Sequence, residues 1–285
     1  MAARPTVRRR ILGMEFRKLR DQAELTMEEA SGSLGWHQSK LSRVENGRSG
    51  VRAHEVARVL DLYGVSSPEE REALAALARE GKQRVWWQPY SDVLTQRYAS
   101  YIGFEAEAVA MRCFQTVLVP GLLQTADYAR ATIQALQPES SSEDVRALVE
   151  VRLARQNAVL AREEPLSMWA ILDEAVLRRQ VGGHGVRDKQ LLRLAEAADQ
   201  PHIVLQVLPF DSGTHIGMLG PFVILEFPLR GDLDVVYSES LTSSLYLERD
   251  EDLAAYGRSF DLLRAAALDT GPSLDLITRI AKGTE

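Results

Sequence analysis

The amino-acid sequence predicts an all-α helix-turn-helix domain followed by a larger α+β domain with a small, mostly antiparallel sheet. Two observations lead to this fold class. Residues 25–47 contain two short amphipathic segments with glycines between them, which is the layout of a helix-turn-helix. From residue 166 onward, helical periodicity gives way to short segments rich in β-branched and aromatic residues, separated by Gly, Pro and Asp turns.

Length and charge divide the chain in a similar way. A chain of 285 residues is long enough for two cores. Residues 1–64 hold 12 basic and 8 acidic residues, a net charge of +4, whereas the whole chain has −6, which leaves −10 for the remainder. A basic module attached to an acidic domain is typical of nucleic-acid binding, because basic side chains neutralise phosphates. The expected organisation is a helix-turn-helix DNA-binding domain over 1–66, a connector helix and aromatic linker over 67–95, and an α+β regulatory domain over 96–285.

Local signals define the elements of the first domain. Its expected helices span about residues 6–23, 26–34, 38–46 and 52–63. Thr26 and Glu29 are spaced as a capping box, which starts the second of these helices. Gly35 allows the backbone to turn after that helix. On the third helix, Leu41 and Val44 are spaced to pack inward.

Polar residues form the outward face of this third helix. They are Gln38, Ser39, Ser42 and Arg43. Gln pairs well with adenine and Arg with guanine, while Ser can bond to either base edges or phosphates. The sequence therefore predicts that this face reads DNA bases. The alternative is an ordinary helical hairpin whose polar residues are merely solvated.

The segments TMEEA and QSKLSRVENG resemble the phage-repressor and Xre class of helix-turn-helix proteins. In that class the first outward residues of the second motif helix contact bases, and these match the four residues above. The resemblance also implies that Glu45 is structural and pairs with a basic residue of the preceding helix, for which Arg20 is the best match. This chain departs from the pattern at Met27, where Gln is usual, and at His37, where a Ser or Thr cap is expected.

Phosphate contacts are expected from polar and basic residues around the motif. They are Arg17, Lys18, Lys40, Asn46 and Arg48. A single helix-turn-helix module usually binds DNA weakly, and two modules spaced one helical turn apart multiply the affinity. We therefore expect a homodimer on an inverted repeat of double-stranded DNA.

The second part of the chain reads as helices followed by strands. Helices are expected at about residues 69–81, 142–163, 188–198 and 251–267, and residues 96–135 are interpreted as mostly helical with a break at Pro120 and Gly121. Strands are expected at about 166–172, 202–210, 220–227, 233–239 and 243–249. We expect helices to cover one face of this sheet.

Four segments of this part resemble a domain of poorly defined biochemistry found behind Xre-type modules in actinobacterial regulators. They are VPGLLQTADYARA, WAILDEAVLRRQVGG, VLPFDSGTHIGMLGPFVILEF and DVVYSESLTSSLYLERDED. The resemblance covers nearly all of residues 85–280 and brings no reaction with it. It implies a transcriptional regulator from a group linked to morphological development and secondary metabolism, often encoded beside a small partner protein.

One loop of the second domain is a candidate binding surface. Residues 209–221 contain three glycines around His215 and Met218, which predicts a long exposed loop. Together with Asp173 and Glu174, at the end of the first expected strand, this loop could border a ligand or partner surface. A loop that merely closes a hairpin is at least as good an interpretation.

Enzymatic chemistry has little support in the sequence. His184, His202 and His215 occur without HExxH spacing or paired cysteines, and the turn at residues 182–185 lacks a phosphate-binding glycine pattern. We therefore expect no enzyme, no catalytic or metal-binding residue and no cofactor. Two rival functions stay open: a small-molecule-sensing repressor and, with less support, a DNA-tethered enzyme.

Cysteine content and hydropathy indicate the compartment. Cys113 is the single cysteine, so no internal disulfide can form. A membrane span needs about 18 consecutive apolar residues, and the sequence contains no such run. It also contains no signal-peptide pattern. The expected location is the cytoplasm.

Overall fold

The computed structural model describes residues 7–80, 86–227 and 234–284. By its internal contacts the chain divides into two compact units, Met1–Pro89 with Gln96–Glu107, and Tyr90–Thr95 with Ala108–Glu285. The first unit is helical and the second combines helices with a sheet, so the predicted fold class is confirmed. Residue 6, the expected start of the first helix, residue 81, the expected end of the connector helix, and residue 233 lie outside the described residues.

The first unit is built from helices, and residues between Leu12 and Ala78 form one apolar core within it. Its helices are α1 (Val7–Gln22), α2 (Met27–Leu34), α3 (Gln38–Glu45), α4 (Ala53–Leu62), α5 (Pro68–Glu80) and α6 (Gln96–Glu107). Phe16 of α1, Leu41 of α3 and Val59 of α4 are completely buried at the centre. Leu74 and Ala78 belong to the same core. The helix expected as a connector, α5, is therefore an integral part of the helical unit.

A mixed sheet organises the second unit. Within the described residues, six strands are hydrogen-bonded in the order β3-β2-β1-β4-β5-β6. They are β1 (Ala110–Gln115), β2 (Ser167–Asp173), β3 (Ile203–Leu208), β4 (Phe222–Glu226), β5 (Val235–Glu239) and β6 (Ser244–Leu247). β1, β2 and β3 run parallel, whereas β4, β5 and β6 continue the sheet from β1 in antiparallel pairings. Most pairings are thus antiparallel, as expected.

Strand β1 corrects the interpretation of residues 96–135 as mostly helical. Its sequence, AMRCFQ, contains Ala, Met, Arg and Gln, which favour helices when isolated. Tertiary pairing overrides this preference, because β1 lies between β2 and β4 and bonds to both. Met111, Cys113 and Phe114 are buried as a result. The sheet therefore contains one strand more than the sequence predicts.

The parallel half of the sheet is joined by helical crossovers. Helices α7 (Ala126–Leu136) and α8 (Ser142–Leu160) connect β1 to β2, and α9 (Glu174–Arg178) and α10 (His184–Ala198) connect β2 to β3. Parallel neighbours require such long connections. α10 begins at His184 and not near residue 188, and Gly182 and Gly183 just before it both have positive φ.

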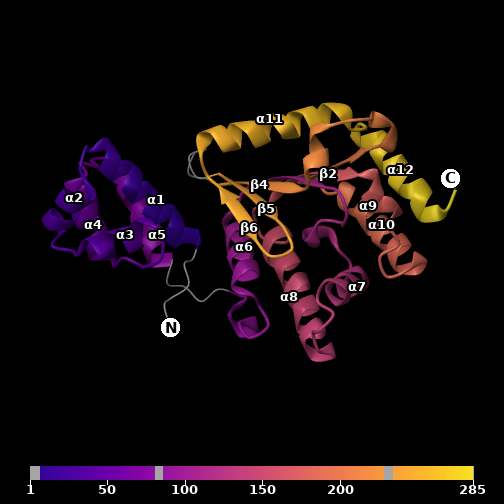
Figure 1. The fold of residues 1–285 in the computed structure, drawn as a ribbon, viewed down its shortest axis with the longest axis horizontal. Coiled ribbons are helices and arrows are strands. Elements are labelled where there is room, and N and C mark those ends of the chain that lie inside the picture. Colours follow the sequence, from indigo (N-terminus) through magenta and orange to yellow (C-terminus); the bar gives the residue numbers. More distant parts are fainter. Residues whose placement is uncertain (1–6, 81–85, 228–233, 285) are drawn as a thin grey trace. The chain divides into compact units, whose positions relative to one another are not determined.

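Both faces of the sheet are buried, whereas the sequence predicts that helices cover only one face. Helix α11 (Asp250–Ala266) covers one face, and α7 and α8 lie on the opposite side (Figure 1). Phe260 and Leu263 of α11 pack with Phe114 and Ile171 in one apolar cluster. Four consecutive residues of β4 are buried, which requires cover on both sides. A last helix, α12 (Thr270–Lys282), contacts α10 and β3 and was not predicted.

Candidate nucleic-acid interface

A complete capping box starts α2. The Glu29 amide donates to Thr26 Oγ1 at 3.2 Å, and the Thr26 amide donates to Glu29 Oε2 at 2.9 Å. Hydrogen bonds from the side chain and backbone of Thr26 lower the pKa of the Glu29 carboxyl, which therefore stays ionised at the positive end of the helix. Gly35 ends α2 in the left-handed conformation with φ of 66°. This glycine makes the turn between the two motif helices.

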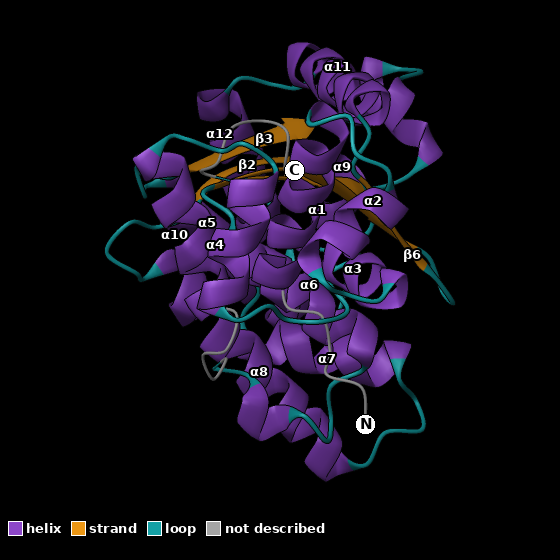
Figure 2. Ribbon diagram, turned by 90° about the vertical axis from the view of Figure 1, so that its left-hand side faces the viewer, coloured by secondary structure: helices purple, strands orange, loops and turns teal. Residues whose placement is uncertain are grey.

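Helix α3 separates a buried face from an exposed one. Leu41 and Val44 are buried in the core of the unit. Gln38, Ser39 and Arg43 are exposed, and Ser42 is half-buried. α3 packs against α2 in the helix-turn-helix arrangement (Figure 2). All four predicted base-reading residues thus belong to the helix that can enter a major groove.

The start of α3 lacks a side-chain cap, as the unusual residue at the position before the helix predicts. His37 occupies the N-cap position and makes no side-chain capping hydrogen bond. Met27, the other departure from the Xre pattern, is partly buried against the core of the unit. An apolar side chain in that position cannot donate to a phosphate or brace Gln38 through a hydrogen bond.

An ion pair joins α1 to the last turn of α3. Arg20 Nε donates to Glu45 Oε1 at 2.8 Å and Arg20 Nη2 donates to Glu45 Oε2 at 3.2 Å. Arg20 Nη1 also donates to the carbonyl of Leu25 at 2.9 Å. The hydrogen bond to Glu45 raises the pKa of Arg20. Arg20 and Glu45 are the pair expected from the sequence, and both are buried.

Two glycines allow α1 and the end of α3 to approach closely, and neither role can be predicted from the sequence. A Cβ atom on Gly13 would lie 2.3 Å from the Val44 carbonyl oxygen and 2.6 Å from that of Glu45. Gly47 has φ of 66°, and a Cβ there would lie 2.8 Å from Arg10 Cα. Only glycine fits at such distances. The backbone of α1 thus fixes where α3 ends.

The predicted phosphate contacts differ in their surroundings. Arg17, Lys18 and Arg48 are exposed at the surface of the unit. The Asn46 side-chain amide donates to the Ser42 carbonyl at 2.7 Å, so this residue also ends α3. Lys40 is the exception, because its side chain is partly buried and turned toward α4.

Lys40 forms contacts that the sequence did not predict. Its Nζ lies 2.5 Å from Glu55 Oε1 and 4.0 Å from the centre of the Trp36 ring. Glu55 also accepts the Arg52 amide at 2.9 Å, which caps α4. Burial raises the pKa of Glu55, but the hydrogen bonds from Lys40 and Arg52 outweigh this and lower it. The signal for the pair, an acidic residue 15 positions after a lysine, is too common to be recognised in one sequence.

In the second unit, Glu174 ties the candidate loop to the end of β2. The Phe210 amide donates to Glu174 Oε2 at 2.9 Å, and Arg178 Nε donates to Glu174 Oε1 at 2.5 Å. Asp173 caps α9 by accepting the Ala175 amide. Both carboxylates therefore have bonds within the fold, and residues 173–174 lie beside the start of the loop.

The loop itself is partly packed and partly exposed. It contains two short 3₁₀ turns, Phe210–Ser212 and Ile216–Leu219. Gly217 is buried against Phe114, and the His215 ring meets the Phe114 ring edge-on at 6.1 Å between centroids. Met218 and Leu219 are 63% and 88% exposed. Of the predicted surface residues, Met218 is therefore the one that clearly faces solvent.

The histidines of the second unit lie on different elements. His184 begins α10, His202 precedes β3, and His215 lies on the loop. In the described part of the chain, no three His, Cys, Asp or Glu side chains come together in a way that could hold a metal ion.

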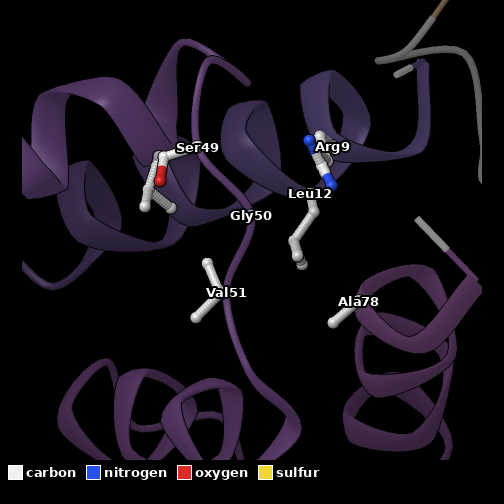
Figure 3. A pocket seen from close by; sticks show the side chains of 7 residues that line it. Arg9, Leu12, Ser49, Gly50, Val51 and Ala78 are labelled. Carbon is white, nitrogen blue, oxygen red and sulfur yellow. The ribbon is translucent and has the colours of Figure 1, made fainter. Parts of the chain in front are cut away.

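Two of the pockets formed by the described residues lie within the helical unit. The smaller one is enclosed by α1, α5 and the segment after α3, with Leu12, Val51 and Ala78 around it (Figure 3). Its volume of about 10 Å³ is close to the least that holds one water molecule, so it is a packing gap. The larger one is an open groove of about 430 Å³ between α4 and α5, lined mainly by apolar residues such as Val56 and Leu60.

The comparisons match the N-terminal and C-terminal parts of the chain to two separate families. Residues 11–74 match the helix-turn-helix domain family, and residues 98–279 match a domain of unknown function, DUF5753. No curated protein and no solved structure matches the chain. Among the described residues, no helix combines the length and apolar character needed to cross a bilayer. Because the second match covers more than half of the sequence, the chain belongs to the DUF5753 family and has a helix-turn-helix domain in front of that domain.

Proposed function

We propose that this protein is a sequence-specific DNA-binding transcriptional regulator of the Xre class. The observation that carries the proposal is helix α3, which buries Leu41 and Val44 and exposes Gln38, Ser39 and Arg43 within a helix-turn-helix domain. Side chains of these types discriminate bases through hydrogen bonds in the major groove.

Base reading and phosphate contacts have separate roles in this mechanism. Gln38, Ser39, Ser42 and Arg43 specify the sequence. Exposed Arg17, Lys18 and Arg48 hold the backbone and set the register of α3 in the groove. The ion pair between Arg20 and Glu45 keeps α3 in place while these contacts form.

We infer that the protein binds an inverted repeat of DNA as a homodimer, because a single helix-turn-helix domain would bind DNA only weakly. One α3 helix reads only a few base pairs, and a second copy one helical turn away adds an equal set of contacts. The acidic second domain is then proposed to control the output through a small protein partner encoded nearby or through a ligand, as in regulators of bacterial development. The alternatives are a small-molecule-sensing repressor and, with less support, a DNA-tethered enzyme.

Selection from a random-sequence pool of duplex DNA with the full-length chain tests this function. We expect enrichment of a short motif that occurs twice as an inverted repeat. Enrichment of a single half-site would contradict the dimer but not the DNA reading. No enrichment over the starting pool would contradict sequence-specific binding.

A further inference from the structure

Lys40 lies on the DNA-reading helix, yet its charge is engaged inside the protein. It follows Ser39 in α3, and its ammonium contacts both the Glu55 carboxylate and the face of the Trp36 indole. The side chains of Lys40 and Glu55 are 33% and 15% exposed. A cation held between a carboxylate and an aromatic face gives up both contacts when it turns toward a phosphate.

Glu55 is held in place independently of Lys40. Its second oxygen accepts the Arg52 amide at 2.9 Å at the start of α4. Val56, the next residue, is completely buried in the core of the unit. The carboxylate is therefore fixed next to α3 and does not move away with Lys40.

We propose that Glu55 withholds Lys40 from the DNA backbone and thereby acts as a specificity-determining residue. This inference rests on the proposed DNA-binding function. Glu55 takes the place that a phosphate oxygen would otherwise occupy at the Lys40 ammonium. The sequence-independent attraction between the protein and DNA is therefore weaker by one phosphate contact, whereas base reading by Gln38 and Arg43 is retained. This replaces the expectation that Lys40 is itself a phosphate contact.

The salt dependence of DNA binding measures the number of phosphates that a protein neutralises, with a slope of about 0.9 per phosphate in a plot of log affinity against log salt. Fluorescence anisotropy with a labelled duplex of random sequence gives this slope for the native chain, Lys40→Gln, Glu55→Gln and the double variant. The side-chain oxygen of Gln at position 55 can still accept the Arg52 amide, so α4 keeps its start.

Of the four proteins, only Glu55→Gln is expected to depart from the native slope. Lys40→Gln matches the native chain, because Lys40 contributes no phosphate contact. Glu55→Gln has a slope steeper by about 0.9, which is about a threefold larger loss of affinity between about 50 and 200 mM salt. The double variant returns to the native slope. On a selected specific duplex, Glu55→Gln also lowers the ratio of specific to random-sequence affinity.

A matched control separates the release of Lys40 from a change in net charge. Glu69 is an exposed carboxylate in the first turn of α5, and Glu69→Gln removes the same charge without touching Lys40. We expect the native slope for this control. An equal steepening in Glu69→Gln, or in the double variant, would overturn the proposal.

The Lys40→Gln variant can overturn the proposal even if Glu55→Gln does not fold. A slope flattened by about 0.9 in Lys40→Gln would show that Lys40 already contacts a phosphate, which would overturn the withholding by Glu55 but leave DNA binding intact. If the native chain binds neither the random nor the selected duplex, the proposed function and this inference fail together.

Discussion

The guanidinium of Arg20 donates two hydrogen bonds to the carboxylate of Glu45, so the end of α1 holds the last turn of α3, the helix proposed to read DNA. Both side chains are almost completely buried. A buried pair of this kind is weak evidence for net stability, but removal of one partner leaves an uncompensated charge. The ion pair therefore connects the packing of the helical unit to the position of the exposed face of α3.

Arg20→Met should destabilise the helical unit by roughly 3 to 5 kcal/mol, because Glu45 is left buried without its partner. Urea unfolding followed by circular dichroism measures the change. The double variant Arg20→Met with Glu45→Leu should recover much of the loss. A double variant less stable than Arg20→Met would contradict this explanation.

Gly13→Ala should cost about 1 to 3 kcal/mol, because its Cβ would overlap the backbone carbonyls of Val44 and Glu45. Gly32→Ala is a matched control, since Gly32 lies within α2 and has no atom within 4 Å of an added Cβ. The control should gain up to about 1 kcal/mol from helix propensity. Equal melting temperatures for the two variants would show that the close approach has no energetic importance.

The stability of the helical unit should fall in acid partly through Glu55. Hydrogen bonds from Lys40 and Arg52 lower its folded pKa despite the opposing effect of burial. A lowered folded pKa adds stability that is fully present above the unfolded value of about 4.3 and is lost as the pH falls through the folded pKa. The difference in unfolding free energy between the native chain and Glu55→Gln should therefore be larger at about pH 7 than at about pH 3. A difference that does not change with pH would contradict this role.

Glu174→Ala should destabilise the second unit by about 1 to 3 kcal/mol, because the Phe210 amide and Arg178 lose their acceptor. Limited proteolysis should also cleave residues 209–221 faster. Glu163→Ala, at an exposed position after α8, should stay within about 0.5 kcal/mol of the native chain. Native-like cleavage of Glu174→Ala would show that Glu174 does not hold the loop.

Local signals made the helix-turn-helix predictable from sequence. The capping box of Thr26 and Glu29 and the left-handed turn at Gly35 each depend on residues within one turn of the chain. Features that depend on residues far apart in the sequence cannot be predicted from such local signals. Strand β1 consists largely of helix-favouring residues and becomes a strand only between β2 and β4.

The same limit applies to the candidate site. The outward face of α3 follows from helical periodicity, and Arg20 with Glu45 followed from family resemblance. The pairing of Lys40 with Glu55 and the close approach at Gly13 depend on how three helices pack. Neither leaves a pattern in a single sequence. The charge of Lys40 alone therefore predicts a contact with the DNA backbone.

The most direct test of the account compares Arg43→Ala with Arg48→Ala in equilibrium titrations against a selected duplex and its single-base variants. We predict that Arg43→Ala costs about 1 to 3 kcal/mol and relaxes the preference at one base position. Arg48→Ala should weaken binding to all duplexes alike and flatten the salt slope. A uniform loss across all duplexes for Arg43→Ala would contradict base reading by α3.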